Sequence, residues 1–142
     1  MYRSYFKEWD VKSDFVQEFV TLWDGWLGED ECYKLDLVTE KEWCCFNNFI
    51  KSISNKYKLM AVDCDSEKLI EIDDINKTLS TYKNSINKGP DSFSKYVIPE
   101  LNCIITEEWD YTYIIWHKNN GALEKLIPLI NEVGLKNFGP CT

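Results

Sequence analysis

The side chains most suited to molecular recognition gather in the segment Glu107-Glu108-Trp109-Asp110, where three carboxylates surround one tryptophan. Carboxylates placed next to one another repel, and a positively charged partner relieves that repulsion. Tryptophan is enriched among the few residues that dominate the binding energy of protein interfaces. The segment therefore predicts a site for a basic partner if Trp109 is exposed. A Trp109 folded back onto the core would instead leave an ordinary solvated turn.

Further acidic side chains lie in the first third of the chain. We expect Glu29, Asp30 and Glu31 to form an acidic loop, and Asp14 and Glu18 to lie one turn apart on a helix. A solvated protein surface is enough to explain any one of these acids. As a group, these acidic residues are expected to support partner binding by the segment 107–110.

One histidine offers an alternative, catalytic interpretation. If the strand pairing described below continues, His117 lies opposite Glu100, whose carboxylate would raise the pKa of the imidazole and favour general-base chemistry. The same pairing places Cys103 and His117 on opposite faces of the hairpin, which disfavours a catalytic Cys–His pair. The sequence has no glycine-rich phosphate loop, nucleophile elbow or dinucleotide fingerprint. We therefore expect a binding protein, with a small cytoplasmic enzyme using His117 and Glu100 as the alternative.

The six cysteines show no zinc-binding pattern. No Cys-x-x-Cys pair occurs, the adjacent Cys44 and Cys45 are poorly spaced for zinc, and His117 is the single histidine. The N-terminus has no apolar signal region, and no apolar run approaches the ~18 residues of a membrane-spanning helix. We expect a cytoplasmic protein with six reduced thiols, no metal site and no cofactor.

Composition sets the broad class. The chain has 142 residues, 44% hydrophobic residues and a formal net charge of −8, which predicts one folded domain spanning residues 1–142. Residues 1–50 contain eleven acidic and five basic residues, so the excess acid is concentrated there. Nucleic acids and anionic membranes are disfavoured as partners because both are negatively charged. A basic protein partner suits this charge, as does plain solubility. The sequence does not indicate an oligomeric state.

The segment 101–117 is the expected centre of the fold. Two apolar, β-prone runs flank the polar break at 107–110, which is typical of a β-hairpin. If Thr106 faces Tyr111, both faces of the hairpin are largely apolar, and the hairpin should lie inside a sheet covered on both sides. One face would carry Leu101, Cys103, Ile105, Thr112, Ile114 and Trp116.

The rest of the sequence predicts helices and short strands around this hairpin. Three- and four-residue spacing of apolar side chains predicts helices over residues 14–26, 43–57, 72–86 and 123–133. Alternation predicts strands over 33–38, 59–64 and 93–98, residues 67–72 fit either a strand or a helix, and the tail from 136 to 142 is expected to be loose. Together these elements predict an α+β fold, with a mostly antiparallel sheet and three to four packed helices.

In size, charge and expected fold, the chain resembles the immunity proteins of bacterial toxin systems, including contact-dependent growth inhibition. The acidic excess in residues 1–50 and the tip Glu107-Glu108-Trp109-Asp110 carry this resemblance. It is a resemblance of overall type and assigns no role to a particular residue. It implies binding to a cognate toxin domain, often a basic nuclease, in the cytoplasm of the producing cell. A regulatory or scaffold module that binds another cellular protein has the same sequence features.

Overall fold

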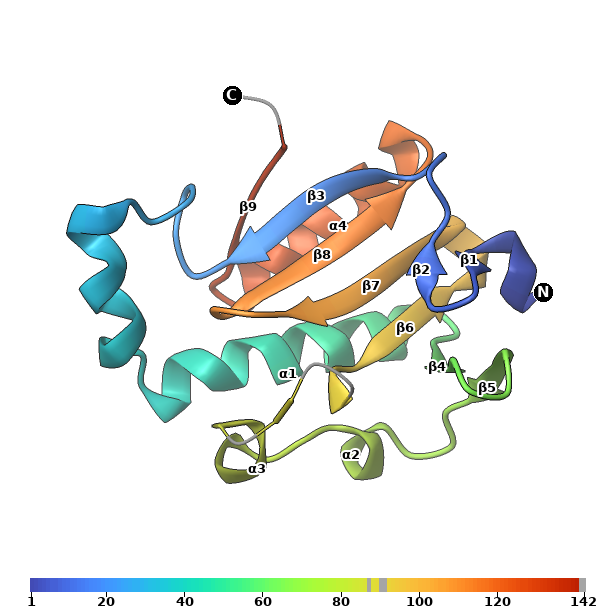
Figure 1. Cartoon of the computed structure of the whole chain (residues 1–142), viewed down its shortest axis with the longest axis horizontal. Coiled ribbons are helices and arrows are strands. Elements are labelled where there is room, and N and C mark those ends of the chain that lie inside the picture. The colour runs from blue at the N-terminus through green and yellow to red at the C-terminus, as the bar shows by residue number, and fades with distance from the viewer. Residues whose placement is uncertain (87, 90–91, 141–142) are drawn as a thin grey trace.

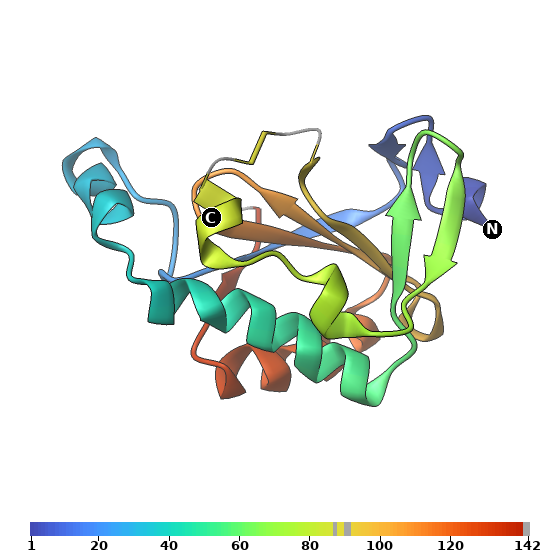
Figure 2. The same cartoon turned by 90° about the horizontal axis from the view of Figure 1, so that it is seen from below.

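The computed structural model describes residues 1–86, 88–89 and 92–140. Over these residues, seven strands form one antiparallel sheet in the order β5-β4-β6-β7-β8-β3-β9 (Figure 1). The strands are β3 (Val16–Thr21), β4 (Met60–Asp63), β5 (Lys68–Glu71), β6 (Lys95–Ile98), β7 (Cys103–Glu108), β8 (Thr112–His117) and β9 (Lys136–Phe138). The long helices α1 (Glu40–Lys56) and α4 (Asn120–Glu132) pack on one face of this sheet (Figure 2). The α+β prediction and the central place of the hairpin are confirmed.

The hairpin β7–β8 has a different register from the expected one. Ile105 lies opposite Ile115 and Glu108 opposite Thr112, so the pairing is shifted by three residues. Glu107 and Glu108 extend strand β7, and the loop shrinks to Trp109, Asp110 and Tyr111. Asp110 and Tyr111 have φ angles of 60° and 56°. Two left-handed residues close this tight loop, which a simple apolar–polar boundary does not reveal.

The shifted register assigns side chains to faces differently. Cys103, Ile105, Tyr113 and Ile115 belong to the main core beneath the helices. The opposite face of the hairpin carries Ile104, Thr106, Glu108, Thr112, Ile114 and Trp116. A shift by an odd number of residues moves one strand's side chains to the other face relative to its partner. This change decides which side chains can form a site.

The range 14–26, for which the spacing predicts a helix, contains strand β3 (Val16–Thr21) and no helix. β3 pairs with β8 on one side and with β9 on the other. The helical spacing of Phe15, Phe19, Leu22 and Trp26 is coincidental, because only Phe19 lies in β3 and the other three lie in the segments that flank it. Strand β9 likewise corrects the expected loose tail, since residues 136–138 pair along β3. The remaining tail positions 141 and 142 lie outside the described residues.

The two long helices confirm the prediction made for them. Thr39 and Glu42 form the capping box at the start of α1, with the Glu42 amide donating to Thr39 Oγ1 at 3.2 Å. Asn119 caps α4 by accepting from the Ala122 amide at 3.1 Å, and Gly134 follows that helix with φ of 88°. Their buried faces pack on the main core.

Several shorter segments differ from the expected elements. Residues 29–37, predicted to be an acidic loop and a strand, form the exposed 3₁₀ segment η2 (Glu29–Leu37). The ambiguous residues 67–72 contain strand β5, and the helix expected over 72–86 divides into α2 (Ile75–Thr78) and α3 (Tyr82–Ile86). Pro99 ends β6 and begins the 3₁₀ turn η4 (Pro99–Leu101).

The N-terminal residues form a second, smaller core on the face of the sheet away from the long helices. The 3₁₀ turn η1 (Tyr2–Ser4) precedes the short hairpin β1 (Phe6–Lys7) and β2 (Asp10–Val11). The buried members of this core are Tyr2, Tyr5, Phe6, Phe15, Val97 and Ile104. Among the described residues, the helices are all too short or too polar to cross a bilayer.

The described cysteines are free thiols, and they differ in exposure. Cys103 is 0% exposed, and burial raises the pKa of its thiol to about 12. Cys32 is exposed on η2. At pH 8 we expect iodoacetamide to modify Cys32 rapidly in the folded protein and Cys103 only after unfolding, because the thiolate is the reactive form. Peptide mapping by mass spectrometry measures both, and equal modification in the folded state would contradict the assignment. Cys141 lies outside the described residues.

Candidate functional site

No long helix of the described chain covers the face of the sheet opposite α1 and α4 (Figure 1), although most side chains on this face are buried. We use "open face" for this surface, which carries Gln17, Phe19, Thr21, Ile104, Thr106, Glu108, Thr112, Ile114 and Trp116. The N-terminal hairpin β1–β2 lies at one end of it, and the segment leading into η2 lies at the other end (Figure 1). The tip of the β7–β8 hairpin lies between them, which makes the tip accessible from this side.

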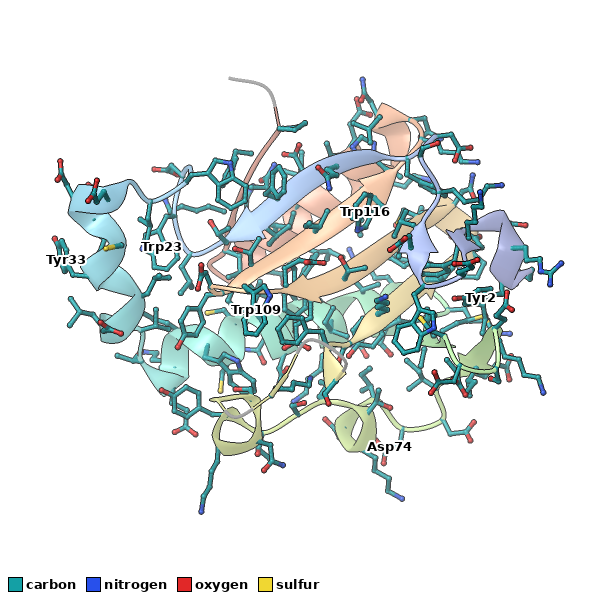
Figure 3. All side chains as sticks on the ribbon, in the orientation of Figure 1. Tyr2, Trp23, Tyr33, Asp74, Trp109 and Trp116 are labelled. Atoms are coloured by element: carbon teal, nitrogen blue, oxygen red, sulfur yellow. The ribbon has the colours of Figure 1, made fainter. Side chains whose placement is uncertain are left out.

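Trp109 is exposed at the hairpin tip. Its side chain keeps 58% of its surface accessible and packs edge-on against Phe93, with ring centroids 4.9 Å apart. Figure 3 shows Trp109 at the tip, Trp116 farther along the open face, and Trp23 on the segment across from the tip. Trp109 is therefore exposed, as the predicted binding site requires.

Glu107 does not belong to the exposed tip. Its side chain is only 13% exposed, and its Oε1 accepts from Lys88 Nζ and from the Ser94 amide, each at 2.8 Å. The observed register turns Glu107 toward the helix-covered face, opposite Tyr113. This carboxylate joins β7 to the segment before β6, so we correct its expected role from a binding charge to a structural one.

Glu108 and Asp110 remain on the accessible side of the tip. Glu108 Oε2 accepts from Thr106 Oγ1 at 2.7 Å, and Thr106 Oγ1 in turn accepts from Trp116 Nε1 at 2.9 Å. Asp110 is exposed, and its backbone carbonyl accepts from Thr112 Oγ1 at 3.3 Å. Neither carboxylate has an ion-pair partner within the described part of the chain. Their charges are therefore available to a partner.

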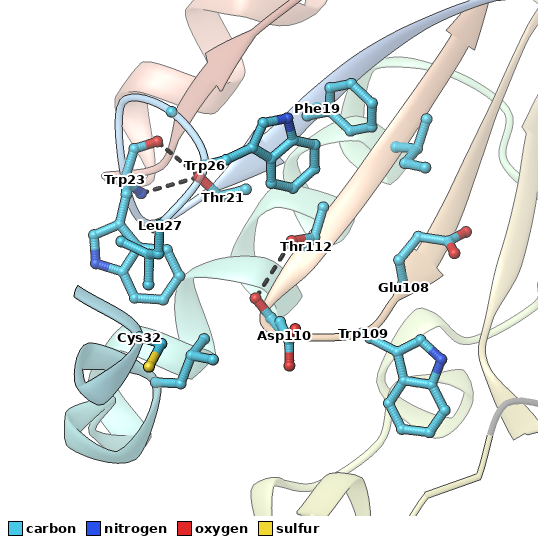
Figure 4. Close-up of a pocket in the computed structure, with 13 residues that line it drawn as sticks. Phe19, Thr21, Trp23, Trp26, Leu27, Cys32, Glu108, Trp109, Asp110 and Thr112 are labelled. Carbon is cyan, nitrogen blue, oxygen red and sulfur yellow. Dashed lines mark hydrogen bonds between the residues drawn. The ribbon is translucent and has the colours of Figure 1, made fainter. Parts of the chain in front are cut away.

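A pocket of about 420 Å³ separates this tip from the segment that follows β3. Figure 4 shows Trp23, Trp26 and Leu27 on one side and Glu108, Trp109 and Asp110 on the other. Thr21 fixes the turn at Trp23, because its Oγ1 donates to the Trp23 carbonyl at 2.7 Å and accepts from the Trp23 amide at 3.0 Å. The lining is Phe19, Thr21, Trp23, Gly25, Trp26, Leu27, Cys32, Leu35, Glu108, Trp109, Asp110, Thr112 and Ile114.

Trp26 is the most accessible aromatic side chain of this pocket. It is 60% exposed, and its ring contacts Phe19 at 4.6 Å and Phe138 at 4.9 Å between centroids, in both cases edge-to-face. The helical spacing predicted that Trp26 would lie on the buried stripe of a helix. Neither Trp26 nor Trp23 was therefore predicted to line a binding site. The sequence signal was two tryptophans around Gly25, in a segment where a glycine interrupts the apolar pattern.

The remaining predicted acids are not among the residues that line the pocket beside the tip. Glu29, Asp30 and Glu31 are exposed on η2, where Glu31 pairs with Lys34 at 3.5 Å. Glu18 is only 8% exposed, and its Oε2 accepts from Asn137 Nδ2 at 2.8 Å. Burial removes Glu18 from an exposed acidic face.

Asp14 is also separate from the tip. It precedes β3 and does not share a helix with Glu18, and its Oδ2 lies 2.9 Å from Lys118 Nζ. This hydrogen bond lowers the pKa of the Asp14 carboxyl, which is therefore already paired within the chain.

His117 and Glu100 do not form the expected pair. Glu100 is exposed on η4, whereas His117 is only 5% exposed. His117 lies opposite Val16 of β3, and its Nδ1 is 3.2 Å from the Asn119 carbonyl oxygen. The register also places Cys103 and His117 on the same face, contrary to expectation. The raised pKa of Cys103 keeps this buried thiol protonated at neutral pH and makes it a poor nucleophile.

The residues described by the structure contain no cluster of three His, Cys, Asp or Glu side chains placed to hold a metal ion. No protein-family model, curated protein sequence or solved structure matches the chain. The exposed tip and the pocket beside it are therefore the features from which a function is argued.

Proposed function

We propose that this chain is an immunity protein that binds and neutralises a basic bacterial toxin domain through the tip of the β7–β8 hairpin. The observation that carries the proposal is the hairpin tip, where exposed Trp109 stands between Glu108 and Asp110 and borders an aromatic pocket. Neither carboxylate has an ion-pair partner among the described residues. An apolar anchor within complementary charge is the usual composition of a tight protein interface.

The exposed tryptophans favour a protein partner. Trp109 and Trp26 are 58% and 60% exposed, although large aromatic side chains are highly buried on average. Covering them would remove apolar surface from water, which stabilises association. The net charge of −8 favours a basic surface on that partner and would accelerate encounter through long-range attraction.

Neutralisation would follow from where the carboxylates are held. A toxin that cleaves nucleic acid needs a positively charged surface to bind phosphates. Glu108 and Asp110 would occupy such a surface, and Trp109 would pack beside it, so that the substrate could no longer enter. The complex would form in the cytoplasm of the producing cell, where the toxin would otherwise act.

Co-expression tests this function directly. If the gene immediately upstream encodes a large secreted protein, the C-terminal domain of that protein is expressed in a bacterial host with and without this chain. We expect growth arrest by that domain alone and full growth when this chain is present. An upstream gene of another kind, or arrest that this chain does not relieve, would refute the immunity function and favour a regulatory or scaffold partner.

Association with the toxin domain is expected to depend on Glu108 and Asp110. Glu108→Gln/Asp110→Asn should slow association at low salt by about tenfold, because electrostatic steering acts mainly on the association rate. Asn tolerates the left-handed backbone at position 110, so the fold should be retained. Stopped-flow mixing at several salt concentrations measures the rate.

The matched control for this variant is Glu124→Gln/Glu132→Gln. It removes the same charge from exposed positions on α4, which covers the other face. Its association rate should stay close to that of the wild type. If both double variants slow association equally, net charge acts without a specific tip site.

A further inference from the structure

We propose that the pocket between the hairpin tip and the segment after β3 receives one arginine side chain of the toxin domain. This inference rests on the proposed function and names the group that the site recognises. The pocket volume of about 420 Å³ lies within the range of roughly 300–1,000 Å³ typical of ligand pockets.

The aromatic walls suit a planar cation. The indoles of Trp23 and Trp26 line the pocket on one side, and Trp109 borders the other side with its indole directed away from them (Figure 4). The face of an indole ring attracts a cation, and the guanidinium group of arginine also stacks flat on such a face. Phe19 and Phe138 support Trp26 edge-to-face, so this ring is held in place before a partner arrives.

The charges of the pocket also favour a cation. Glu108 and Asp110 contribute carboxylates to the lining, and the described residues of the lining include no lysine, arginine or histidine. The five donors of a guanidinium can bind either carboxylate while its flat surface contacts an indole. A lysine ammonium would find the carboxylates but is more strongly hydrated and lacks a flat surface, so arginine is the better fit.

Two small probes test the preference for a guanidinium. Acetyl-arginine methylamide is titrated into the isotopically labelled protein, and acetyl-citrulline methylamide serves as its neutral counterpart of nearly equal shape. The arginine probe should shift the indole N–H signals of Trp23 and Trp26 saturably, while Trp43, which is 9% exposed on α1, stays unchanged. Equal shifts with both probes would overturn the proposal, because they would show an apolar rather than a cationic pocket.

Filling the pocket tests whether the toxin uses it. Gly25 lines the pocket, and a Cβ built there meets no atom within 4 Å, so Gly25→Phe adds bulk without a clash at the backbone. This variant should abolish the response to the arginine probe and weaken toxin binding by more than about tenfold, as expected for loss of a central contact. Gly28→Phe is the matched control, because Gly28 has the same free space and lies outside the pocket lining.

The outcomes separate this inference from the proposed function. Toxin binding that persists in Gly25→Phe at wild-type strength, with no response to the arginine probe, would overturn the arginine pocket and leave the immunity function standing. A response to the arginine probe without any toxin binding or protection would refute the immunity function, and with it the assignment of the arginine to a toxin.

Discussion

Glu107→Ala is expected to lower the free energy of unfolding by about 3 kcal/mol, the lower end of what breaking a buried ion pair costs. In the wild-type protein, Glu107 Oε1 lies 2.8 Å from Lys88 Nζ and 2.8 Å from the Ser94 amide nitrogen. The substitution removes this acceptor from both groups. Ser80 Oγ remains 2.9 Å from Lys88 Nζ and softens the loss. Urea denaturation followed by circular dichroism measures the change.

A control on the helical surface makes this result specific. Glu124→Ala removes an exposed carboxylate from α4 and should change stability by less than about 0.5 kcal/mol. An unfolding midpoint for Glu107→Ala equal to that of Glu124→Ala would show that the Lys88–Glu107 pair contributes nothing. Replacing both Lys88 and Glu107 by leucine should recover part of the loss, because no unpaired charge then remains.

The structural role of Glu107 affects which substitutions can be used to test binding at the tip. A variant that neutralises Glu107, Glu108 and Asp110 together would lose binding through loss of structure as well as loss of charge. Glu108 and Asp110 can be altered without that ambiguity, since neither has an ion-pair partner among the described residues. Binding experiments should therefore leave Glu107 in place.

Trp109→Ala is expected to weaken toxin binding by about 2 kcal/mol or more, roughly thirtyfold in Kd, because it removes the central apolar anchor. The fold should tolerate the change, since Trp109 is 58% exposed and its aromatic contact is with Phe93. Isothermal titration calorimetry gives the affinity, and circular dichroism confirms the fold.

Ile70→Ala provides the comparison for Trp109→Ala. Ile70 is 49% exposed on the edge strand β5 and lies outside the pocket beside the tip, so its removal should leave affinity within about twofold. A Trp109→Ala variant with wild-type affinity would refute the anchor. The acidic residues of η2 would then be the next surface to test.

Local signals in the sequence predicted the elements that are stabilised locally. The capping box at Thr39 and the spacing of apolar residues along residues 43–57 are satisfied within α1 itself, so they needed no knowledge of the fold. The hairpin was also recognisable, because two apolar runs flank a polar break. Its register was not, because two left-handed residues at Asp110 and Tyr111 shorten the loop.

The errors arose where distant strands decide the structure. β3 is a strand because it pairs with β8 and β9, about a hundred residues later in the chain, and no local pattern records those partners. The same pairing carries Trp23 and Trp26 to the hairpin tip. The tip residues Trp109, Glu108 and Asp110 were therefore predictable, whereas the pocket they share with the first third of the chain was not.

The hydrogen bonds from Trp116 through Thr106 to Glu108 bear on the entropy of association. Each side chain that is immobilised on binding costs about 0.5–1.5 kcal/mol in lost rotamer freedom. Thr106 Oγ1 donates to Glu108 Oε2 and is itself oriented by the Trp116 indole, so this carboxylate has one preferred position in the free protein. Glu108 is thus preorganised, and a partner that meets it gains the charge interaction with little further loss of side-chain freedom.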